Sequence, residues 1–387
     1  MQFLSKIVLK KFIKPEISAV GFDESYIETA TKKHLFLSIK IFDVTPSQAT
    51  IIKQTALSCG CDCAVNRGVI DCSVSFSDCI LSGTLAQIKN VAKKLAPQPF
   101  SLSKLSQILL EQLKIEENKT FKSKIVGILN LTPNSFSDGG EYLEIEKAIN
   151  HSIDMIEAGA DVIDIGAQST KPKTELVSVM YEIEKVIPIV TALKTAYPHV
   201  ELSVDTMSLS CAKASIDAGA DIINDVSFLS NPEIASLVAK NNKKLVIMHS
   251  RGNSYTMDNL TNYDNLVDEI YKELYEKTQF AQSFGLDKNS IIVDVGFGFA
   301  KTINQNFELL SKIKEFKSLG YPVFAGVSRK RFLQDVINTK EPKDSDIQTL
   351  LATSYLIQNE IDYIRVHNVE LTRQAVLFND RLMNYNS

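Results

Sequence analysis

Eight short runs of apolar, β-prone residues recur over residues 125–367, and longer stretches with helical periodicity separate them. This alternation predicts βα units and a parallel sheet, because each crossover helix returns the chain to the same end of the sheet. The expected strands are residues 125–130, 161–166, 202–205, 221–224, 245–249, 291–294, 323–327 and 363–367. The clearest helical stretches are residues 145–158, 176–196, 265–284, 306–319 and 347–359.

Eight βα units in about 265 residues match the size and strand number of an α/β fold, the closed (β/α)8 or TIM barrel. An internal repeat supports this prediction, since Ala-Gly-Ala-Asp-Val-Ile-Asp at residues 158–164 recurs as Ala-Gly-Ala-Asp-Ile-Ile-Asn at residues 218–224. In each copy we expect a helix to end, a glycine to turn the chain and a buried strand to begin. A doubly wound open sheet is the alternative, but the sequence carries no glycine-rich dinucleotide loop.

Residues 1–120 have a different pattern, and we expect them to be a small α+β module preceding the barrel of residues 121–387. The expected elements are a strand at 35–42, a helix at 47–58, a hairpin-like pair at 61–65 and 69–76, a short strand at 79–82 and a helix at 84–95. A connecting helix at 103–117 and a polar linker at 116–120 would follow. The charge changes at the same point: residues 1–120 carry 15 Lys and Arg against 11 Asp and Glu, a net of +4, which leaves −8 for the rest of a chain whose total is −4.

Composition excludes several classes of function. The apolar share of 44% and the charged share of 23% are those of an ordinary globular protein. A net charge of −4 argues against a nucleic-acid partner, which would favour a basic surface. The sequence has no apolar run near the roughly 18 residues that span a bilayer, and its first 15 residues do not resemble a signal peptide. We therefore expect a cytoplasmic protein that binds small molecules and neither nucleic acid nor membranes.

Polar residues end nearly every expected barrel strand. They are Asn130, Asp164, Asp205, Asn224, His249, Asp294, Ser328 with Lys330, and Arg365 with His367. Active sites of TIM barrels lie at the C-terminal ends of the strands, so these side chains should converge on one cavity. A single strand-end residue such as Asp164 could instead cap the following helix, but caps do not require Ser-Arg-Lys or Arg-Val-His triplets.

Three of the strand ends lead into polar loops that contain glycine or proline, at residues 130–140, 166–172 and 294–301. Loops of this kind around a polar mouth suggest a site that closes over its substrate and excludes water. Phe136 and Phe299 lie in these loops and are interpreted as walls for a planar apolar substrate, with a core position as the alternative.

These loops resemble those of the dihydropteroate synthase family. The matching segments are residues 130–140, 164–172, 203–206, 222–225, 248–249, 294–301, 326–330 and 364–367, all in the family's order. The resemblance covers residues 125–370 and not residues 1–120. It implies a TIM barrel that condenses p-aminobenzoate with (7,8-dihydropterin-6-yl)methyl diphosphate, gives 7,8-dihydropteroate and diphosphate in folate biosynthesis, and uses Mg²⁺.

The resemblance also implies roles for individual residues. The pterin would be bound by Asp205, Asn224, Met248, Asp294, Lys330 and Arg365, with Asp205 and Lys330 as catalytic residues. The diphosphate would be bound by Asn130, Lys171, Arg365 and His367, with Asn130 as the Mg²⁺ ligand. The p-aminobenzoate would be surrounded by Phe136, Thr170, Pro172, Phe299 and Ser328. In the family mechanism diphosphate leaves first, and Asp205 would stabilise the cation on the pterin methylene before the arylamine attacks.

The sequence departs from the family at Lys171, where most members have Arg, and at Asn134, Gln168, Val295 and Asn368. Two alternatives therefore stay open: a pterin-dependent methyltransferase of the same superfamily, and a non-catalytic homologue that binds pterin. The first loop and the Ser328–Lys330 triplet argue against the methyltransferase, because a methyl donor needs no diphosphate site.

Five of the six cysteines, namely Cys59, Cys61, Cys63, Cys72 and Cys79, lie in the N-terminal module. The Cys-x-Cys-x-Cys spacing fits a tetrahedral zinc ion poorly, so we interpret them as free thiols in a small core. The module itself is expected to be a dimer or docking interface, or a structural cap on the barrel. We expect the whole chain to form a homodimer.

Overall fold

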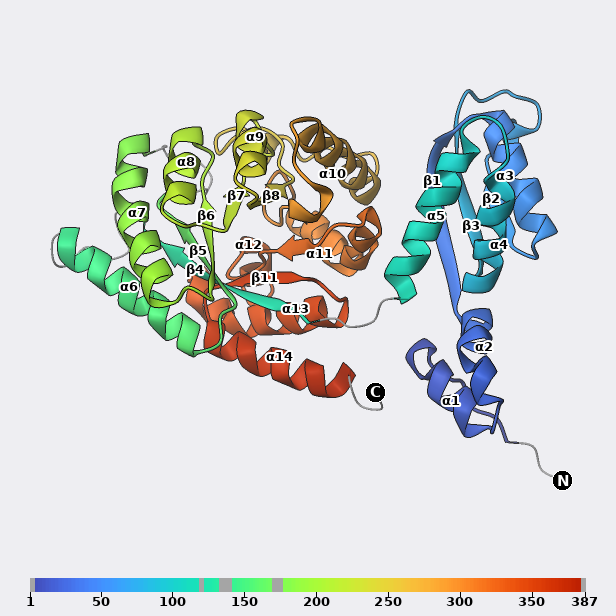
Figure 1. Ribbon diagram of the computed structural model, residues 1–387, viewed down its shortest axis with the longest axis horizontal. Helices are drawn as coiled ribbons and strands as arrows, with labels where there is room; N and C mark the ends of the chain where they lie inside the picture. The colour runs from blue at the N-terminus through green and yellow to red at the C-terminus, as the bar shows by residue number, and fades with distance from the viewer. Residues whose placement is uncertain (1–3, 118–121, 132–140, 169–176, 384–387) are drawn as a thin grey trace. The chain divides into compact units, whose positions relative to one another are not determined.

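The computed structural model describes residues 4–117, 122–131, 141–168 and 177–383. The chain divides into two compact units, Met1–Lys119 and Thr120–Tyr385, close to the boundary expected from composition. Figure 1 labels the elements of both units.

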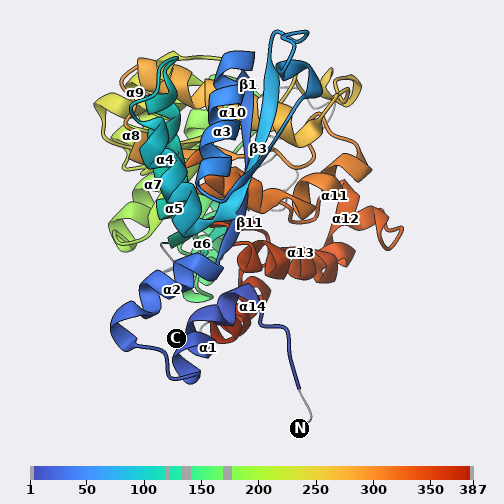
Figure 2. The same cartoon turned by 90° about the vertical axis from the view of Figure 1, so that its right-hand side faces the viewer.

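The N-terminal unit contains a three-stranded antiparallel sheet in the order β1-β3-β2. Its elements are β1 (Phe36–Val44), α3 (Pro46–Ser58), β2 (Asp62–Val65), β3 (Ser77–Thr84), α4 (Leu85–Leu95) and α5 (Leu102–Glu117). Helices α3 and α4 pack on the strands and α5 packs on α4 (Figure 2). Two helices that the sequence pattern does not predict precede the sheet, α1 (Ile13–Ala19) and α2 (Ile27–His34).

The prediction of one strand in this module is wrong. Residues 69–76 are not a strand, and the hairpin partner of β2 is β3, with Cys63 opposite Leu81. Burial explains the difference, because Cys79 and Leu81 are 0% exposed in the core whereas Ile70 is 88% exposed. The thiols of Cys61, Cys63 and Cys79 are buried in this core as expected, but Cys72 is exposed.

The second unit is a closed barrel of eight parallel strands, which confirms the predicted fold. The strands are β4 (Lys124–Asn130), β5 (Val162–Gly166), β6 (Glu201–Asp205), β7 (Ile222–Asp225), β8 (Lys244–Met248), β9 (Ile291–Asp294), β10 (Val323–Ala325) and β11 (Tyr363–Val366). They pair in sequence order, and β11 closes the barrel against β4.

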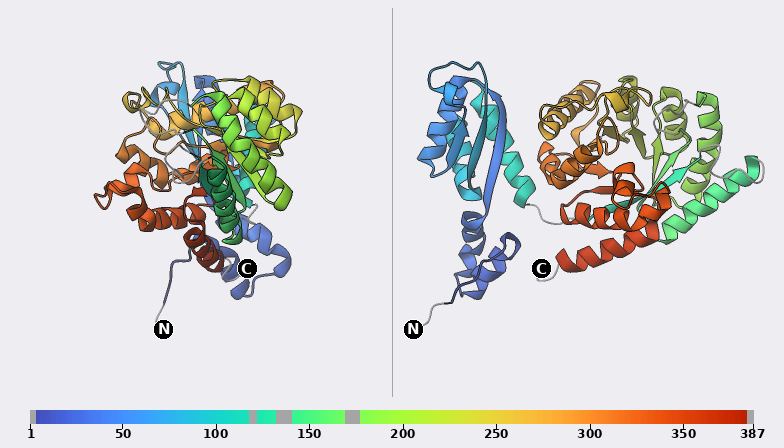
Figure 3. Two further views of the ribbon diagram at one scale, coloured as in Figure 1. Left: turned by 90° about the vertical axis from the view of Figure 1, so that its left-hand side faces the viewer. Right: turned by 180° about the vertical axis from the view of Figure 1, so that it is seen from behind.

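Helices surround the barrel on its outside (Figures 1 and 3). They are α6 (Glu141–Glu157), α7 (Val179–Ala196), α8 (Leu209–Asp217), α9 (Glu233–Lys240), α10 (Leu266–Ser283), α11 (Ile303–Ser311), α12 (Arg331–Asp335), α13 (Asp346–Gln358) and α14 (Val369–Met383). The helix expected at 306–319 is two elements, since a 3-10 helix (Ile313–Leu319) follows α11. No helix in the described part of the chain is long and apolar enough to cross a membrane.

The internal repeat has a physical basis. Gly159 and Gly219 have φ of +101° and +112°, a backbone conformation that residues with a Cβ rarely adopt. After each glycine an aspartate ties the next strand to the preceding one: Asp161 Oδ2 accepts from Ile125 N at 2.8 Å, and Asp221 Oδ2 accepts from Leu202 N at 3.1 Å. The repeated sequence therefore sets the start of two strands at the N-terminal end of the barrel.

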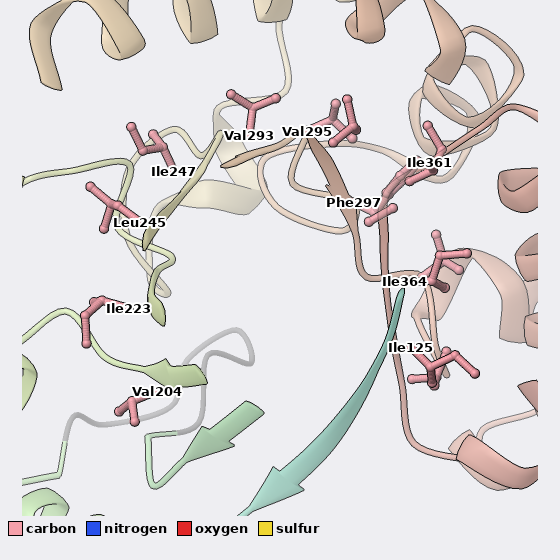
Figure 4. Close-up of a cluster of buried hydrophobic side chains, with 14 of the residues drawn as sticks. Ile125, Val204, Ile223, Leu245, Ile247, Val293, Val295, Phe297, Ile361 and Ile364 are labelled. Carbon is pink, nitrogen blue, oxygen red and sulfur yellow. The ribbon is translucent and has the colours of Figure 1, made fainter. Parts of the chain in front are cut away.

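Side chains alternate along the strands between the outside and the inside of the barrel. Outward residues such as Val204, Ile223, Leu245 and Val293 belong to the large core between strands and helices (Figure 4). Inward residues between the start and the middle of the strands form a second apolar cluster, which consists of Val126, Val162, Ile222, Val246, Ile292, Phe324 and Tyr363. This cluster fills the barrel, so inward side chains two residues further along the strands lie at its C-terminal mouth.

Candidate active site

The inward side chains beyond the apolar cluster are polar on five strands. They are Asp164 on β5, Asp205 on β6, Asn224 on β7, Asp294 on β9 and Arg365 on β11. All five residues except Arg365 are at most 6% exposed. Four of the five are expected to bind the pterin, and the structure brings them to one mouth through the alternation of a parallel barrel.

Asp164 is the centre of a buried hydrogen-bond network in this mouth. Its carboxylate accepts from Ser203 Oγ at 2.6 Å, from Asn224 Nδ2 at 3.3 and 3.4 Å, and from Arg365 Nε at 2.6 Å. Arg365 Nη2 also reaches Asp205 Oδ2 at 3.2 Å. Asp164 therefore orients the other residues of the mouth and does not cap a helix through its side chain. The sequence predicts its strand-end position but not this role.

Asn224 has a buried acceptor that no group in the described part of the chain satisfies. Its Nδ2 is used by Asp164, whereas its Oδ1 is buried and has no partner among the described residues. Buried polar atoms are nearly always hydrogen-bonded, and an unpaired one carries a free-energy penalty. The amide oxygen is therefore suited to a ligand that donates an N–H group.

Asp294 and Lys330 are connected through the loop that follows β9. Asp294 Oδ1 accepts from Gly296 N at 2.8 Å, and Lys330 Nζ donates to Phe297 O at 2.8 Å. Burial raises the pKa of Asp294 to about 6, and burial lowers the pKa of Lys330 to about 8. Each of the two charges stabilises the other. Asp294 can therefore accept hydrogen bonds from a ligand while Lys330 donates to the same ligand.

Asp205 lies among other carboxylates. Burial raises its pKa, Arg365 opposes the rise, and Asp164 and Glu182 add to it. A cation that arrives or forms beside Asp205 would therefore be stabilised by a carboxylate that is otherwise difficult to ionise.

Ser328 and His367 form a pair in the segments that follow the last two strands, β10 and β11. Ser328 Oγ lies 3.0 Å from His367 Nδ1 and accepts from His367 N at 3.2 Å. Burial, with Arg365 and Arg329 nearby, lowers the pKa of His367 to about 3, so the ring is neutral near pH 7. Arg329 has φ of 55°, and its guanidinium contacts Asp346, the first residue of α13, at 2.7 and 2.9 Å.

Two of the expected ligand walls are present in the described structure. Met248 ends β8, is 3% exposed and is paired in register with Asp294. The ring of Phe299 is partly exposed, and Lys330 Nζ lies 4.3 Å from its centroid. Phe297, two residues earlier, is instead a core residue that stacks on Phe332. Phe136, Thr170, Lys171 and Pro172 lie outside the described residues.

A Mg²⁺ ion would have one protein ligand from the expected set. Asn130 is the last residue of β4 and is exposed at the mouth, where its amide oxygen could face a ligand. Among the described residues no group of three or more His, Cys, Asp and Glu side chains could hold a metal. Oxygen ligands and several waters are what Mg²⁺ prefers, so Asn130 fits an ion that substrate oxygens also bind.

Comparison with known proteins agrees with this geometry. The model of a family described as pterin binding enzyme matches residues 126–367, nearly the whole barrel. The dihydropteroate synthase of Synechocystis sp. is 39% identical over 262 residues, which cover 67% of this chain and 90% of that protein. The chain belongs to the dihydropteroate synthase family.

Solved dihydropteroate synthases share the barrel. The Xanthomonas albilineans enzyme with 4-aminobenzoic acid has a TM-score of 0.64 and 35% identity, and the match covers 67% of this chain and 93% of that chain. The Yersinia pestis dihydropteroate synthase in a sulfonamide drug complex also has a TM-score of 0.64, with 33% identity over 68% of this chain and 95% of that chain.

One relative extends beyond the barrel. A probable bifunctional folylpolyglutamate synthase/dihydropteroate synthase of Haloferax volcanii is 34% identical over 351 residues. The match covers 85% of this chain but 41% of that longer protein. Residues 120–387 are about 69% of the chain (268 of 387), so part of the N-terminal module also has a counterpart in this dihydropteroate synthase relative.

Proposed function

We propose that the chain condenses (7,8-dihydropterin-6-yl)methyl diphosphate with p-aminobenzoate to 7,8-dihydropteroate and diphosphate, a step of folate biosynthesis. The observation that carries the proposal is the mouth of the barrel, where the unpaired Asn224 Oδ1 lies in one buried site with the Asp294 carboxylate and the Lys330 ammonium. A pterin edge presents N–H donors beside a carbonyl acceptor, which is the complement of these three groups.

The pterin would be bound through its edge and its faces. Asp294 accepts from ring and exocyclic N–H groups, Asn224 Oδ1 accepts another, and Lys330 donates to the carbonyl oxygen and a ring nitrogen. Met248 and Arg365 pack against the ring faces, since a guanidinium stacks well on a planar system. Both acceptors are buried, so each hydrogen bond forms in a site with little competing water.

The diphosphate would lie on the side of His367, Arg365, Lys171 and Asn130. His367 acts as a neutral donor there: Ser328 Oγ accepts from His367 N, so its hydroxyl proton is free for Nδ1 and the ring proton remains on Nε2. Mg²⁺ bound by Asn130 would neutralise charge on the leaving group. Ser328 is also the proposed partner of the p-aminobenzoate carboxylate, through its backbone N–H because its hydroxyl proton is used by His367 Nδ1, with Phe136, Thr170, Pro172 and Phe299 around the ring.

The reaction breaks the bond between the pterin methylene carbon and the diphosphate oxygen, and forms a bond between that carbon and the arylamine nitrogen. The electron pair leaves with diphosphate, and Asp205 stabilises the positive charge that spreads into the ring. The arylamine nitrogen then attacks the methylene carbon and releases one proton to water. Lys330 holds the ring carbonyl and nitrogen during both steps.

The test is a turnover assay with the purified chain, the pterin diphosphate and p-aminobenzoate. We expect equal amounts of 7,8-dihydropteroate and diphosphate, and loss of both products in Asp205→Ala. A chain that binds the pterin diphosphate but releases no diphosphate would support the non-catalytic alternative. Methyl transfer from a reduced folate without diphosphate chemistry would support the methyltransferase.

A homodimer is proposed through the outer face of α13 and α14, which pack side by side. Ile347, Leu351 and Tyr355 recur every four residues on α13 and are 64%, 65% and 40% exposed. Leu377 and Phe378 on α14 are 54% and 65% exposed. Apolar surface of this kind is typical of protein interfaces. Light scattering should give twice the chain mass, and Leu351→Glu should give the single mass. The control is Tyr275→Glu on α10, where Tyr275 is 48% exposed, and this variant should keep twice the chain mass. The expected compartment is the cytoplasm, which suits six free cysteines.

A further inference from the structure

His249 follows β8, yet it does not face the mouth where a ligand would bind. Its ring is 0% exposed and lies beside the rings of Phe228 and Tyr263, with centroids 5.2 and 6.4 Å away. Both ring nitrogens have polar neighbours: Nε2 is 3.0 Å from Glu273 Oε2, and Nδ1 is 3.1 Å from Lys301 Nζ. The residue therefore links helix α10, which carries Glu273, to the loop after β9, which carries Lys301.

The hydrogen-bond donors and acceptors of Glu273, His249 and Lys301 determine which of their atoms carry protons. Hydrogen bonds from His249 and Arg251 hold Glu273 ionised and lower its pKa to about 2, so His249 Nε2 must carry a proton and donate. Burial lowers the pKa of His249 to about 4, so the neutral ring has no proton left for Nδ1, which must accept. Burial lowers the pKa of Lys301 to about 7. In its charged form Lys301 Nζ donates three times: to His249 Nδ1, to Gly296 O at 3.0 Å and to Phe299 O at 2.9 Å.

Through these three hydrogen bonds Lys301 fixes the conformation of the loop of residues 296–301. The same loop connects the two residues that are proposed to bind the pterin edge: its Gly296 N donates to Asp294, and its Phe297 O accepts from Lys330. The loop also lies directly on His249, because a Cβ built on Gly296 would be 1.9 Å from His249 O. A substitution of Lys301 would therefore shift the positions of both Asp294 and Lys330, although Lys301 itself does not contact the ligand.

Helix α10 anchors the outer end of the linkage. Arg251 donates to Glu269 at 2.9 Å and to Glu273, and its guanidinium lies 3.9 Å from the centroid of the Tyr263 ring. Tyr263 OH in turn donates to Ala300 O at 3.2 Å. The loop is thus held at Ala300 from outside and at Gly296 and Phe299 from inside by Lys301.

We propose that Lys301, oriented by His249 and Glu273, is a positioning residue that holds Asp294 and Lys330 in the geometry needed to bind the pterin edge. The inference rests on the proposed function, because it assumes that these two residues bind the pterin. It assigns no contact between Lys301 and the substrate. Its effect is expected on pterin affinity more than on the chemical step.

The experiment measures the Kd of a pterin without diphosphate by calorimetry, together with KM and kcat for the pterin diphosphate. In Lys301→Met we expect both the Kd and the KM to rise by about tenfold or more, the scale of a lost charge-assisted hydrogen bond, with a smaller change in kcat. His249→Asn keeps an acceptor near the position of Nδ1, whereas His249→Gln keeps only a donor near Nε2. We therefore expect His249→Asn to bind pterin more tightly than His249→Gln.

The control for a merely structural effect is Lys317→Met. Lys317 Nζ contacts Asp362 at 2.6 Å, and Asp362 accepts from Val323 N at the opposite end of the barrel. This variant should lose stability and keep the wild-type pterin Kd. The inference is overturned if Lys301→Met binds pterin like the wild type, or if His249→Gln binds as tightly as His249→Asn. A wild-type chain that binds no pterin would instead refute the proposed function, and the two failures are thereby distinguished.

Discussion

Replacing Asn224 by leucine should separate pterin binding from stability. The leucine has a similar volume and removes both the unpaired Oδ1 and the Nδ2 that contacts Asp164. Asp164 keeps its two short partners, Ser203 and Arg365, at 2.6 Å each. The free protein therefore loses two long hydrogen bonds and also loses a buried acceptor that has no partner among the residues the structure describes.

The magnitudes follow from this balance. The two contacts to Asp164, at 3.3 and 3.4 Å, are worth about 1 kcal/mol together, and removing the unpaired oxygen offsets a similar amount. The free energy of unfolding should thus change by less than about 1 kcal/mol. Pterin binding loses a hydrogen bond in a buried site, about 1–3 kcal/mol, so the Kd should rise about 5- to 150-fold.

The matched control is Asn379→Leu on α14. Asn379 is 0% exposed and its amide is fully used, by Ser354 Oγ, Ala375 O and Gln358 Nε2. This variant should lose about 2–4 kcal/mol of stability, because three hydrogen bonds disappear, while pterin affinity stays unchanged. Urea denaturation and calorimetry give the two quantities. If Asn224→Leu kept the wild-type pterin Kd, the assignment of Oδ1 as a pterin acceptor would be wrong.

Three further predictions concern pH, metal and inhibitors. Pterin affinity should rise as pH increases through about 6, where Asp294 ionises, and fall as pH increases through about 8, where Lys330 loses its proton; a pterin Kd that is flat between about pH 5 and 9 would contradict the pairing. Mg²⁺ should bind tightly only when diphosphate is present, because Asn130 is the one expected protein ligand, and calorimetry showing tight binding to the free chain would refute this. Sulfonamides should inhibit in competition with p-aminobenzoate, as steady-state kinetics would reveal, and inhibition that p-aminobenzoate cannot relieve would count against its proposed site.

The barrel can be predicted because its signal is local and repeated eight times. Each β-rich run differs from the observed strand by at most two residues at either end, and β9 (Ile291–Asp294) agrees at both ends. The apolar and polar residues of 69–76 alternate as in a half-buried strand, but the structure has no strand there. Asn66 instead starts a turn by accepting from Gly68 N, and Phe76 is left 61% exposed.

The mouth of the barrel is predictable to the extent that strand-end residues converge in any parallel barrel. The sequence does not reveal which of these residues pair with one another. Asp164 and Arg365 are 201 positions apart, and the ion pair that orients both depends on the closure of β11 against β4. The neutral state of His367 likewise follows from burial beside Arg365, which holds the pKa near 3. His249 is expected in the mouth from its strand-end position, but it points away from it toward α10.

The most direct test of the central claim compares Asp294→Ala with His367→Ala by titrating each with a pterin that lacks diphosphate. Asp294 is proposed to bind the pterin edge, so its loss should weaken the binding of this pterin by about 1–3 kcal/mol or more, because the interaction is charge-assisted. His367 is proposed to contact only the diphosphate, so its loss should leave this affinity nearly unchanged while lowering turnover of the pterin diphosphate. If His367→Ala lost the affinity and Asp294→Ala kept it, the substrate would lie in the opposite orientation, and the roles proposed for these two residues would be wrong.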